Sequence, residues 1–336
     1  MTIDLSPLDS VQRVLFEVPL APMQGHRFQP TGFPGLGAAT FQTSNGTCLL
    51  VESAQSMANR LELTCWDEAK QDLKADLDGL SHVRVLRNGS LLTDTILESH
   101  RLNSPYLLQN SDRIFFDQIK SELGISETGP IDRRKLADVL LKYDIGSLLH
   151  GVFLAKKELA GGRLRVARAL SAFIEADGVR IAASGGVKND HVNPSGDTKA
   201  GFGNVPFARD EFTAERITLY ANLDLAQIRG YGLGREAESL LILLALFKLR
   251  TLIDGNLRLR TACDLCATCE SIPAILPKGL TLPSLGDLTA ALKPIIAVCK
   301  NRMTVSEVDF NDKIEAKKGK EEADEVLPDK TDEDEG

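Results

Sequence analysis

Residues 51–62, VESAQSMANRLE, constrain the fold of this chain more than any other twelve residues. Apolar residues end at Val51, small polar residues follow, and the pattern after them predicts a helix that runs to about Cys65. Such a helix start presents free backbone N–H groups, neutral donors and the positive end of the helix dipole in one direction. The segment predicts an anion site suited to phosphate, although an ordinary cap on a core helix would use the same residues. The candidate ligands are Ser53, Gln55, Ser56, Asn59 and Arg60.

The formal net charge of −8 is concentrated at the C-terminal end of the chain. Residues 307–336 hold 13 acidic and 5 basic residues, so residues 1–306 are neutral overall. We predict a single folded domain over 1–306 and a disordered acidic tail over 307–336, because the tail offers almost no large apolar side chain to bury. The tail either keeps the protein soluble or competes with nucleic acid for a basic groove. A neutral body argues against indiscriminate coating of DNA but leaves local binding open.

Nothing in the sequence resembles a signal peptide or a membrane span. The longest apolar run, residues 240–247, is far too short to cross a bilayer. Six cysteines in 336 residues do not make a disulfide framework. We therefore expect a cytoplasmic protein without a membrane partner.

The order of the predicted elements indicates an α+β fold, because strands and helices are intermixed with large insertions. Asn-Gly pairs at 45–46 and 88–89 predict hairpin turns. Residues 183–208 form the longest stretch without periodicity, and a loop of that length is usually functional or mobile. Strands are predicted at 11–20, 82–86, 91–97, 147–154, 168–174, 216–223 and 257–261, and helices at 112–123, 131–143, 235–250 and 285–300.

Two polar loops carry the side chains that suit a nucleic-acid backbone, in which arginine pairs with phosphate, amides bond to sugar or phosphate, and an aromatic ring stacks. The first is residues 24–31, where Phe28 and Phe33 could equally plug the core. The second is residues 99–106. The candidates from these loops are Gln24, His26, Arg27, Gln29, Arg101 and Asn103.

Further candidates are Arg163 and Arg165, which share one face of an extended segment, and Lys188 and Asn189, which lie in the long glycine-rich stretch. A solvated surface accounts for each arginine equally well. Two loop histidines, His26 and His100, keep open an acid–base ribonuclease.

We expect no metal and no cofactor. Cys263, Cys266 and Cys269 do not match a known cluster spacing, and buried free thiols are the simpler interpretation. The glycines at 230, 232 and 234 do not fit a dinucleotide fingerprint, because Arg235 stands where the third glycine is required.

Together these segments resemble one family. The blocks that match are 28–34 (FQPTGFP), 51–62, 100–105 (HRLNSP), 183–190 (ASGGVKND), 203–207 (GNVPF), 222–225 (NLDL) and 257–263 (LRLRTAC). The chain resembles the backbone subunit of the type I-G (formerly I-U) CRISPR interference complex, a member of the repeat-associated mysterious protein (RAMP) superfamily. The resemblance runs from about Val11 to Ile296 and leaves out the acidic tail.

The resemblance implies a ferredoxin-like (RRM-like) palm with inserted helical fingers over about 111–143 and a thumb loop or hairpin over 183–208. It also implies that several copies polymerise along one guide RNA as a Cascade-type ribonucleoprotein in antiviral defence. The partners would be guide RNA, target DNA through pairing with that RNA, further copies of the chain and other effector subunits.

Two functions follow as hypotheses. The first is a non-catalytic RNA-binding scaffold that accepts any spacer, because it touches phosphate, sugar and base faces while base pairing reads the sequence. The second is an endoribonuclease that acts on guide precursor or bound RNA.

Overall fold

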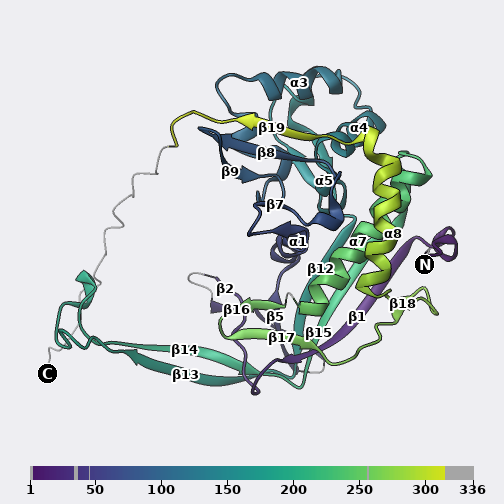
Figure 1. Cartoon of the computed structure of the whole chain (residues 1–336). Helices are drawn as coiled ribbons and strands as arrows, with labels where there is room; N and C mark the ends of the chain where they lie inside the picture. Colours follow the sequence, from purple (N-terminus) through teal and green to yellow (C-terminus); the bar gives the residue numbers. More distant parts are fainter. Residues whose placement is uncertain (1–2, 34–36, 45, 256, 315–336) are drawn as a thin grey trace, which may run out of the picture.

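The computed structural model describes residues 3–33, 37–44, 46–255 and 257–314. Its centre is an antiparallel sheet with strand order β16-β17-β1-β15-β12-β5-β4, and β18 pairs with β1 beside this path (Figure 1). The strands of this sheet are β1 (Arg13–Pro22), β4 (Thr40–Thr43), β5 (Gly46–Glu52), β12 (Leu170–Asp177), β15 (Arg216–Asp224), β16 (Arg258–Arg260), β17 (Cys263–Ala267) and β18 (Ala274–Leu276).

Period-two alternation of side chains builds the central strands. In β12, Leu170, Ala172, Ile174 and Ala176 are buried, and the residues between them are half-buried on the opposite face. The register places Ala172 opposite Ala221 of β15 and Phe173 opposite Tyr220. One face of the sheet therefore belongs to the core and the other remains partly open to solvent.

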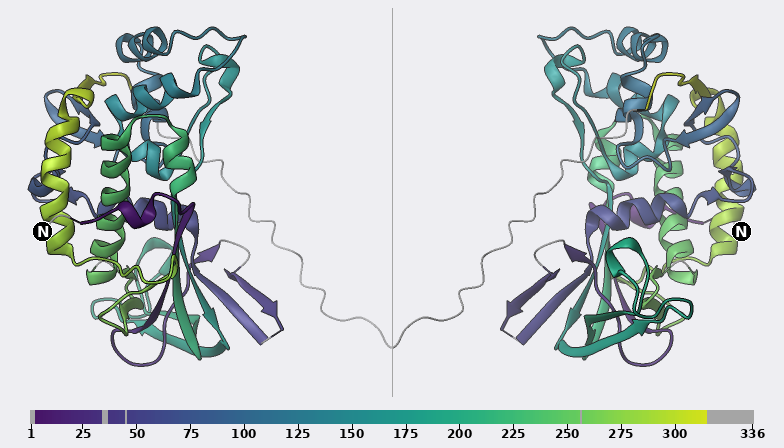
Figure 2. Two further views of the ribbon diagram at one scale, coloured as in Figure 1. Left: turned by 90° about the vertical axis from the view of Figure 1, so that its right-hand side faces the viewer. Right: turned by 90° about the vertical axis from the view of Figure 1, so that its left-hand side faces the viewer.

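Two helices cover the buried face. α1 (Ala54–Leu63) packs on β12, and α7 (Arg235–Gly255) packs against both α1 and β17. α8 (Leu285–Cys299) lies on the outer side of α7 (Figure 2). The short α6 (Leu225–Gly230) also contacts α7, which explains why α7 is apolar on nearly every side.

A large insertion between α1 and β12 forms a second layer. The insertion contributes the paired strands β8 (His82–Arg87) and β9 (Ser90–Asp94) to a small sheet. The later strand β19 (Val305–Asp309) completes this sheet and runs parallel to β8. The helices of the insertion are α2 (Pro105–Leu108), α3 (Ile114–Leu123), α4 (Arg133–Tyr143) and α5 (Ile145–His150). Its remaining strands are β6 (Trp66–Asp67), β7 (Asp72–Leu73), β10 (Val152–Leu154) and β11 (Leu164–Val166).

A long hairpin projects from the body (Figure 1). β13 (Arg180–Lys188) pairs antiparallel with β14 (Val205–Thr213) over their whole length, from Arg180 opposite Thr213 to Lys188 opposite Val205. Most of its side chains are exposed on both faces, so the period-two signal that marks a half-buried strand is missing from its sequence. The minor elements elsewhere are β2 (Gly32–Phe33), β3 (Gly37–Ala38) and the 3-10 turns Ser6–Leu8, Ala75–Leu77, Arg101–Asn103, Ala160–Gly162, Thr198–Ala200 and Lys300–Arg302.

The α+β class predicted from the sequence is confirmed. Helices predicted at 112–123, 131–143, 235–250 and 285–300 correspond to α3, α4, α7 and α8, and both predicted turns connect paired strands, although Asn45 itself lies outside the described residues. The strand predicted at 147–154 is wrong over its first half, because α5 occupies 145–150 and ends at Gly151, whose φ is +80°.

The boundary predicted for the acidic tail is also wrong. Residues 305–309 form β19, Phe310 is buried, and the Asp312 carboxylate accepts hydrogen bonds from the Ser111 amide and hydroxyl. Ordered structure therefore continues past residue 306. The remainder of the predicted tail, residues 315–336, lies outside the described residues. Within the described part, no helix is long and apolar enough to cross a membrane.

Candidate nucleic-acid interface

The start of α1 is reachable from solvent. Ser53 is the N-cap, and its Oγ accepts a hydrogen bond from the Ser56 amide at 3.3 Å. Gln55 and Asn59 are exposed, and Ser53 is half-buried. The opposite side of the helix packs in the core, so the cap also has its ordinary structural role. Because the first N–H groups of a helix have no partner within it, the tip retains donors for an anion.

A buried carboxylate anchors this tip to the sheet. Glu52 is 2% exposed and is paired with Arg260, while Arg60 lies 3.6 Å from the same carboxylate. Arg60 Nη2 also donates to the Leu259 carbonyl at 2.6 Å. The guanidinium of Arg60 is thus largely occupied in holding α1 to β16, which reduces its availability to a ligand.

The first predicted loop is docked beside the tip. The Gln29 amide donates to the Ala262 carbonyl at 2.7 Å, and Arg260 Nη1 donates to the Gln29 carbonyl at 2.8 Å. Phe28 is fully buried and exchanges backbone hydrogen bonds with Phe212 at the base of the β13–β14 hairpin. The alternative interpretation, in which the ring packs in the core, is correct for Phe28. The side chain of Phe33 lies outside the described part of the structure.

Three side chains of this loop remain free to face solvent: Gln24, His26 and Arg27. Arg27 is 55% exposed, with its Nε 3.7 Å from a Glu211 carboxylate oxygen. The structure therefore brings together the α1 tip, the loop and the hairpin base. Lys188 and Asn189 are exposed at the distal end of β13, separated from this group by the length of the hairpin.

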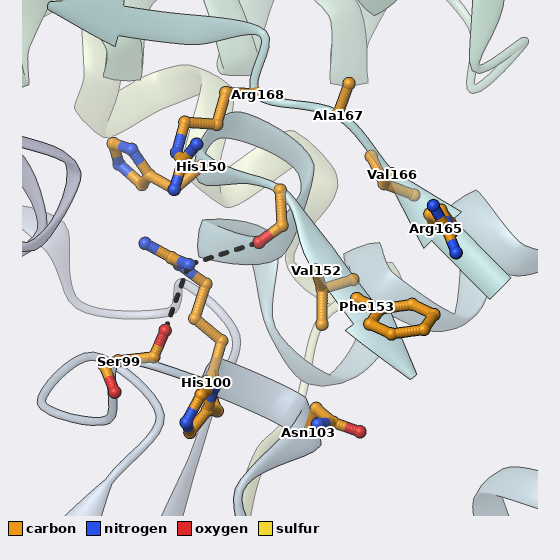
Figure 3. Close-up of a pocket in the computed structure, with 12 residues that line it drawn as sticks. Ser99, His100, Asn103, His150, Val152, Phe153, Arg165, Val166, Ala167 and Arg168 are labelled. Carbon is orange, nitrogen blue, oxygen red and sulfur yellow. Dashed lines mark hydrogen bonds between the residues drawn. The ribbon is translucent and has the colours of Figure 1, made fainter. Parts of the chain in front are cut away.

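The second predicted loop lines a cavity of about 570 Å³ at the junction of the insertion and the sheet (Figure 3). His100 and Asn103 lie on one side, and the β10–β11 hairpin lies on the other. Asn103 Oδ1 accepts a hydrogen bond from the Ala155 amide at 3.1 Å, which fixes the loop to β10. His26 is not part of this cavity, so the two histidines of the ribonuclease hypothesis do not share it.

Arg101 is buried, unlike the exposed candidates of the first loop. It is 5% exposed, and its Nε and Nη2 each donate to a carboxylate oxygen of Glu62 at 2.6 Å. Its Nη1 donates to the Gly151 and Ser99 carbonyls (Figure 3). Burial raises the pKa of Glu62 to about 7, and Arg101 opposes that rise. Arg101 therefore forms a buried ion pair with Glu62, which lies 39 residues earlier in the sequence.

The other two predicted arginines differ in their contacts. Arg163 donates to the carbonyls of Ala160 and Gly129 and so ties two loops together. Arg165 lies over the exposed Phe153 ring, with Cζ 4.7 Å from the ring centroid. Arg165 and Phe153 form a planar cation–aromatic pair at the rim of the cavity (Figure 3).

Sequence reasoning missed His150 and Lys248, and Arg168 was not among its candidate ligands. The Nζ of Lys248 lies 2.9 Å from Nε2 of His150, and both residues are buried. Only one sequence signal points to them, namely a histidine and a lysine within otherwise apolar runs at 148–154 and 240–249.

The comparison with protein families decides the identity. The family model for CRISPR-associated protein GSU0053 matches residues 14–181, which is half of the chain. The chain belongs to this CRISPR-associated family. The match confirms the CRISPR-associated, RAMP-like resemblance inferred from the sequence. It runs from β1 to the start of β13 and includes every predicted ligand except Lys188 and Asn189.

Two solved structures resemble this member of the family loosely. A chain of a "CRISPR RNA-guided surveillance complex, pre-nicking" has 12% sequence identity and a TM-score of 0.40, covering 78% of this chain and 77% of that one. Csc2 from Thermofilum pendens has 10% identity and a TM-score of 0.29, with 88% and 81% covered. No curated protein sequence matches significantly.

The family member shows no sign of a metal centre in its described residues, where no group of three histidine, cysteine or acidic side chains is arranged to hold an ion. All six cysteines are free thiols, and burial raises the pKa of Cys263 to about 11.

Proposed function

We propose that this chain is a non-catalytic scaffold subunit that binds guide RNA in a type I CRISPR effector complex. The observation that carries the proposal is the family match over residues 14–181, because it includes the α1 tip, the docked loop and the cavity. Several copies would bind side by side along one RNA and join other effector subunits. Target DNA would be recognised through pairing with the guide.

The topology supports a ferredoxin-like palm. The strands β17, β1, β15 and β12 lie in that spatial order, and each is antiparallel to its neighbour. α1 lies between β1 and β12 in the sequence, and α7 lies between β15 and β17. This order supports a β-α-β-β-α-β arrangement with long insertions. The insertion with α3 and α4 would be the fingers, and the β13–β14 hairpin would be the thumb.

The chemistry of the exposed candidates supports binding that ignores base identity. Amides, hydroxyls, backbone N–H groups and a few arginines suit phosphate and sugar, and they do not form a pattern that reads base edges. A scaffold that carries many different guides needs this property, because pairing performs the sequence recognition.

Incubation of the purified protein with labelled single-stranded RNA tests the proposal. We expect the RNA to remain intact and to form a complex whose affinity falls as salt is added. In a plot of the logarithm of the binding constant against the logarithm of the salt concentration, each phosphate contact should contribute roughly −0.7 to the slope. Cleavage that His26→Ala or His100→Ala abolishes would instead identify an endoribonuclease, and failure of the RNA to bind would refute the scaffold.

A further inference from the structure

In the buried His150–Lys248 pair, the second ring nitrogen of His150, Nδ1, has no hydrogen-bond partner among the described residues. An ammonium group has only donors, so Lys248 Nζ donates to His150 Nε2 at 2.9 Å. Burial and the neighbouring cations lower the pKa of His150 well below its ordinary value, so its ring is neutral. A neutral ring whose Nε2 accepts must carry its proton on Nδ1. That Nδ1–H is buried, and no hydrogen-bond partner for it is present among the described residues.

Two cations at this cavity, Arg168 and Lys248, have no directly paired carboxylate among the described residues. Within the described part of the chain, Arg168 makes no hydrogen bond or ion pair, and no carboxylate oxygen lies within 4 Å of Arg168 or Lys248. Burial and Arg101 lower the pKa of Arg168. Of the nearby acids, Glu62 is engaged by Arg101, and Asp144 accepts the Ser147 hydroxyl at 2.6 Å.

His150 and Arg168 line the same cavity and lie next to each other in Figure 3. The cavity has a mouth at the β10–β11 hairpin, where Phe153 is 44% exposed beneath Arg165. His150, the unpaired Arg168 guanidinium and the exposed Phe153–Arg165 pair therefore line one cavity.

We propose that this cavity, at which Arg168 is exposed and His150 is buried, binds one phosphate group of a single-stranded RNA. The donors would be the Arg168 guanidinium and His150 Nδ1–H, and the Phe153–Arg165 pair at the mouth would stack on a neighbouring base. Lys248 would act as a positioning residue, because its hydrogen bond fixes the histidine tautomer. The source of the phosphate rests on the proposed function, whereas the recognition of phosphate rests on the cavity.

A phosphate fits this site better than a cation or a protein carboxylate. N–H donors and guanidinium groups repel a metal ion. Phosphate offers acceptor oxygens in several directions and meets donors from separate elements at once, whereas a carboxylate offers two oxygens in one plane. A base adjacent to a backbone phosphate explains the exposed aromatic ring at the mouth.

The experiment compares wild-type protein with Arg168→Gln by fluorescence anisotropy, using a labelled RNA of about 30 nucleotides over a range of sodium chloride concentrations. Lys293→Gln on α8 is the matched control, since it removes one exposed positive charge far from the cavity lining. We expect Arg168→Gln to bind about tenfold to one hundredfold more weakly. Its log–log salt slope should be shallower by about 0.7, and Lys293→Gln should match the wild type. Affinity and slope equal to wild type in Arg168→Gln would overturn the site.

A second arm separates this inference from the function on which it rests. Inorganic phosphate is titrated with each protein, and its phosphorus NMR line width is measured. Broadening of the phosphate line by the wild type but not by Arg168→Gln supports the phosphate site, whether or not RNA binds. A failure of RNA to bind would refute only the scaffold function. Equal broadening by both proteins, or none by either, refutes the phosphate site.

Discussion

The Arg101–Glu62 pair is a stability element. Both side chains are nearly fully buried, and two hydrogen bonds of 2.6 Å join them. Arg101→Ala leaves a buried carboxylate without its partner, so we expect a loss of about 3–5 kcal/mol in the free energy of unfolding, measured by urea denaturation.

Arg27→Ala is the matched comparison. Its side chain is 55% exposed, so the free energy of unfolding should change by no more than about 0.5 kcal/mol. RNA affinity should fall, because an exposed cation of the loop docked beside the α1 tip is lost. A stable Arg101→Ala protein, or an Arg27→Ala protein with unchanged RNA affinity, would reverse these assignments.

His150 gives stability a defined dependence on pH. Its pKa is lowered in the folded state, so the unfolded chain binds a proton that the folded chain does not. The stabilisation is therefore complete above the unfolded pKa of about 6.5 and is lost as pH falls below it.

The test replaces His150 with asparagine, whose carbonyl keeps an acceptor for Lys248. Between about pH 6.5 and 5, the wild type should lose unfolding free energy relative to His150→Asn by at most about 1.4 kcal/mol per pH unit. Parallel pH profiles of the two proteins from urea denaturation would contradict a neutral buried histidine.

The sequence predicted which loops carry polar side chains. It did not predict which of these side chains are exposed to solvent and which are paired inside the protein. The sequence placed Arg101 in a polar loop, and its partner Glu62 comes from another element 39 residues earlier. Long-range pairing of this kind leaves no local pattern. The cap at Ser53 was predictable, because a hydroxyl before a helical period has a local physical cause.

At the scale of elements, the hairpin is separable from the domain. Lys188 and Val205 are opposite each other at its distal end, so an Asn-Gly turn can replace residues 189–204. We expect the shortened protein to fold with unchanged helix and strand signals in circular dichroism. It should bind a long RNA with fewer copies than wild type in sedimentation, because in the proposed scaffold the projecting hairpin would contact a neighbouring copy. Equal copy number would remove the hairpin from assembly.

Periodicity predicted long elements better than short or fully exposed ones. α3 and α4 repeat apolar residues with helical spacing, whereas α5 is six residues long and buried throughout, and a short apolar run does not separate helix from strand. β19 was missed because charge counts drew the tail boundary at Glu307, although Val308 and Phe310 are buried.

For the whole molecule, the order of elements and the charge balance were predictable, and the assembly of the interface was not. Gln29 and the α1 tip meet through Arg260, and Phe28 meets the hairpin base at Phe212, contacts that span about half of the chain or more. A neutral body with a local group of donors would account for the proposed binding of an RNA backbone without a large basic surface.

The most direct measurement is the affinity of the protein for two unrelated single-stranded RNAs of equal length across a series of salt concentrations. The account predicts that the two affinities agree within about threefold. It also predicts that the logarithm of the binding constant falls with the logarithm of the salt concentration, with a slope of roughly −0.7 per phosphate contact. A flat salt response, or a preference for one sequence of more than about tenfold, would contradict it.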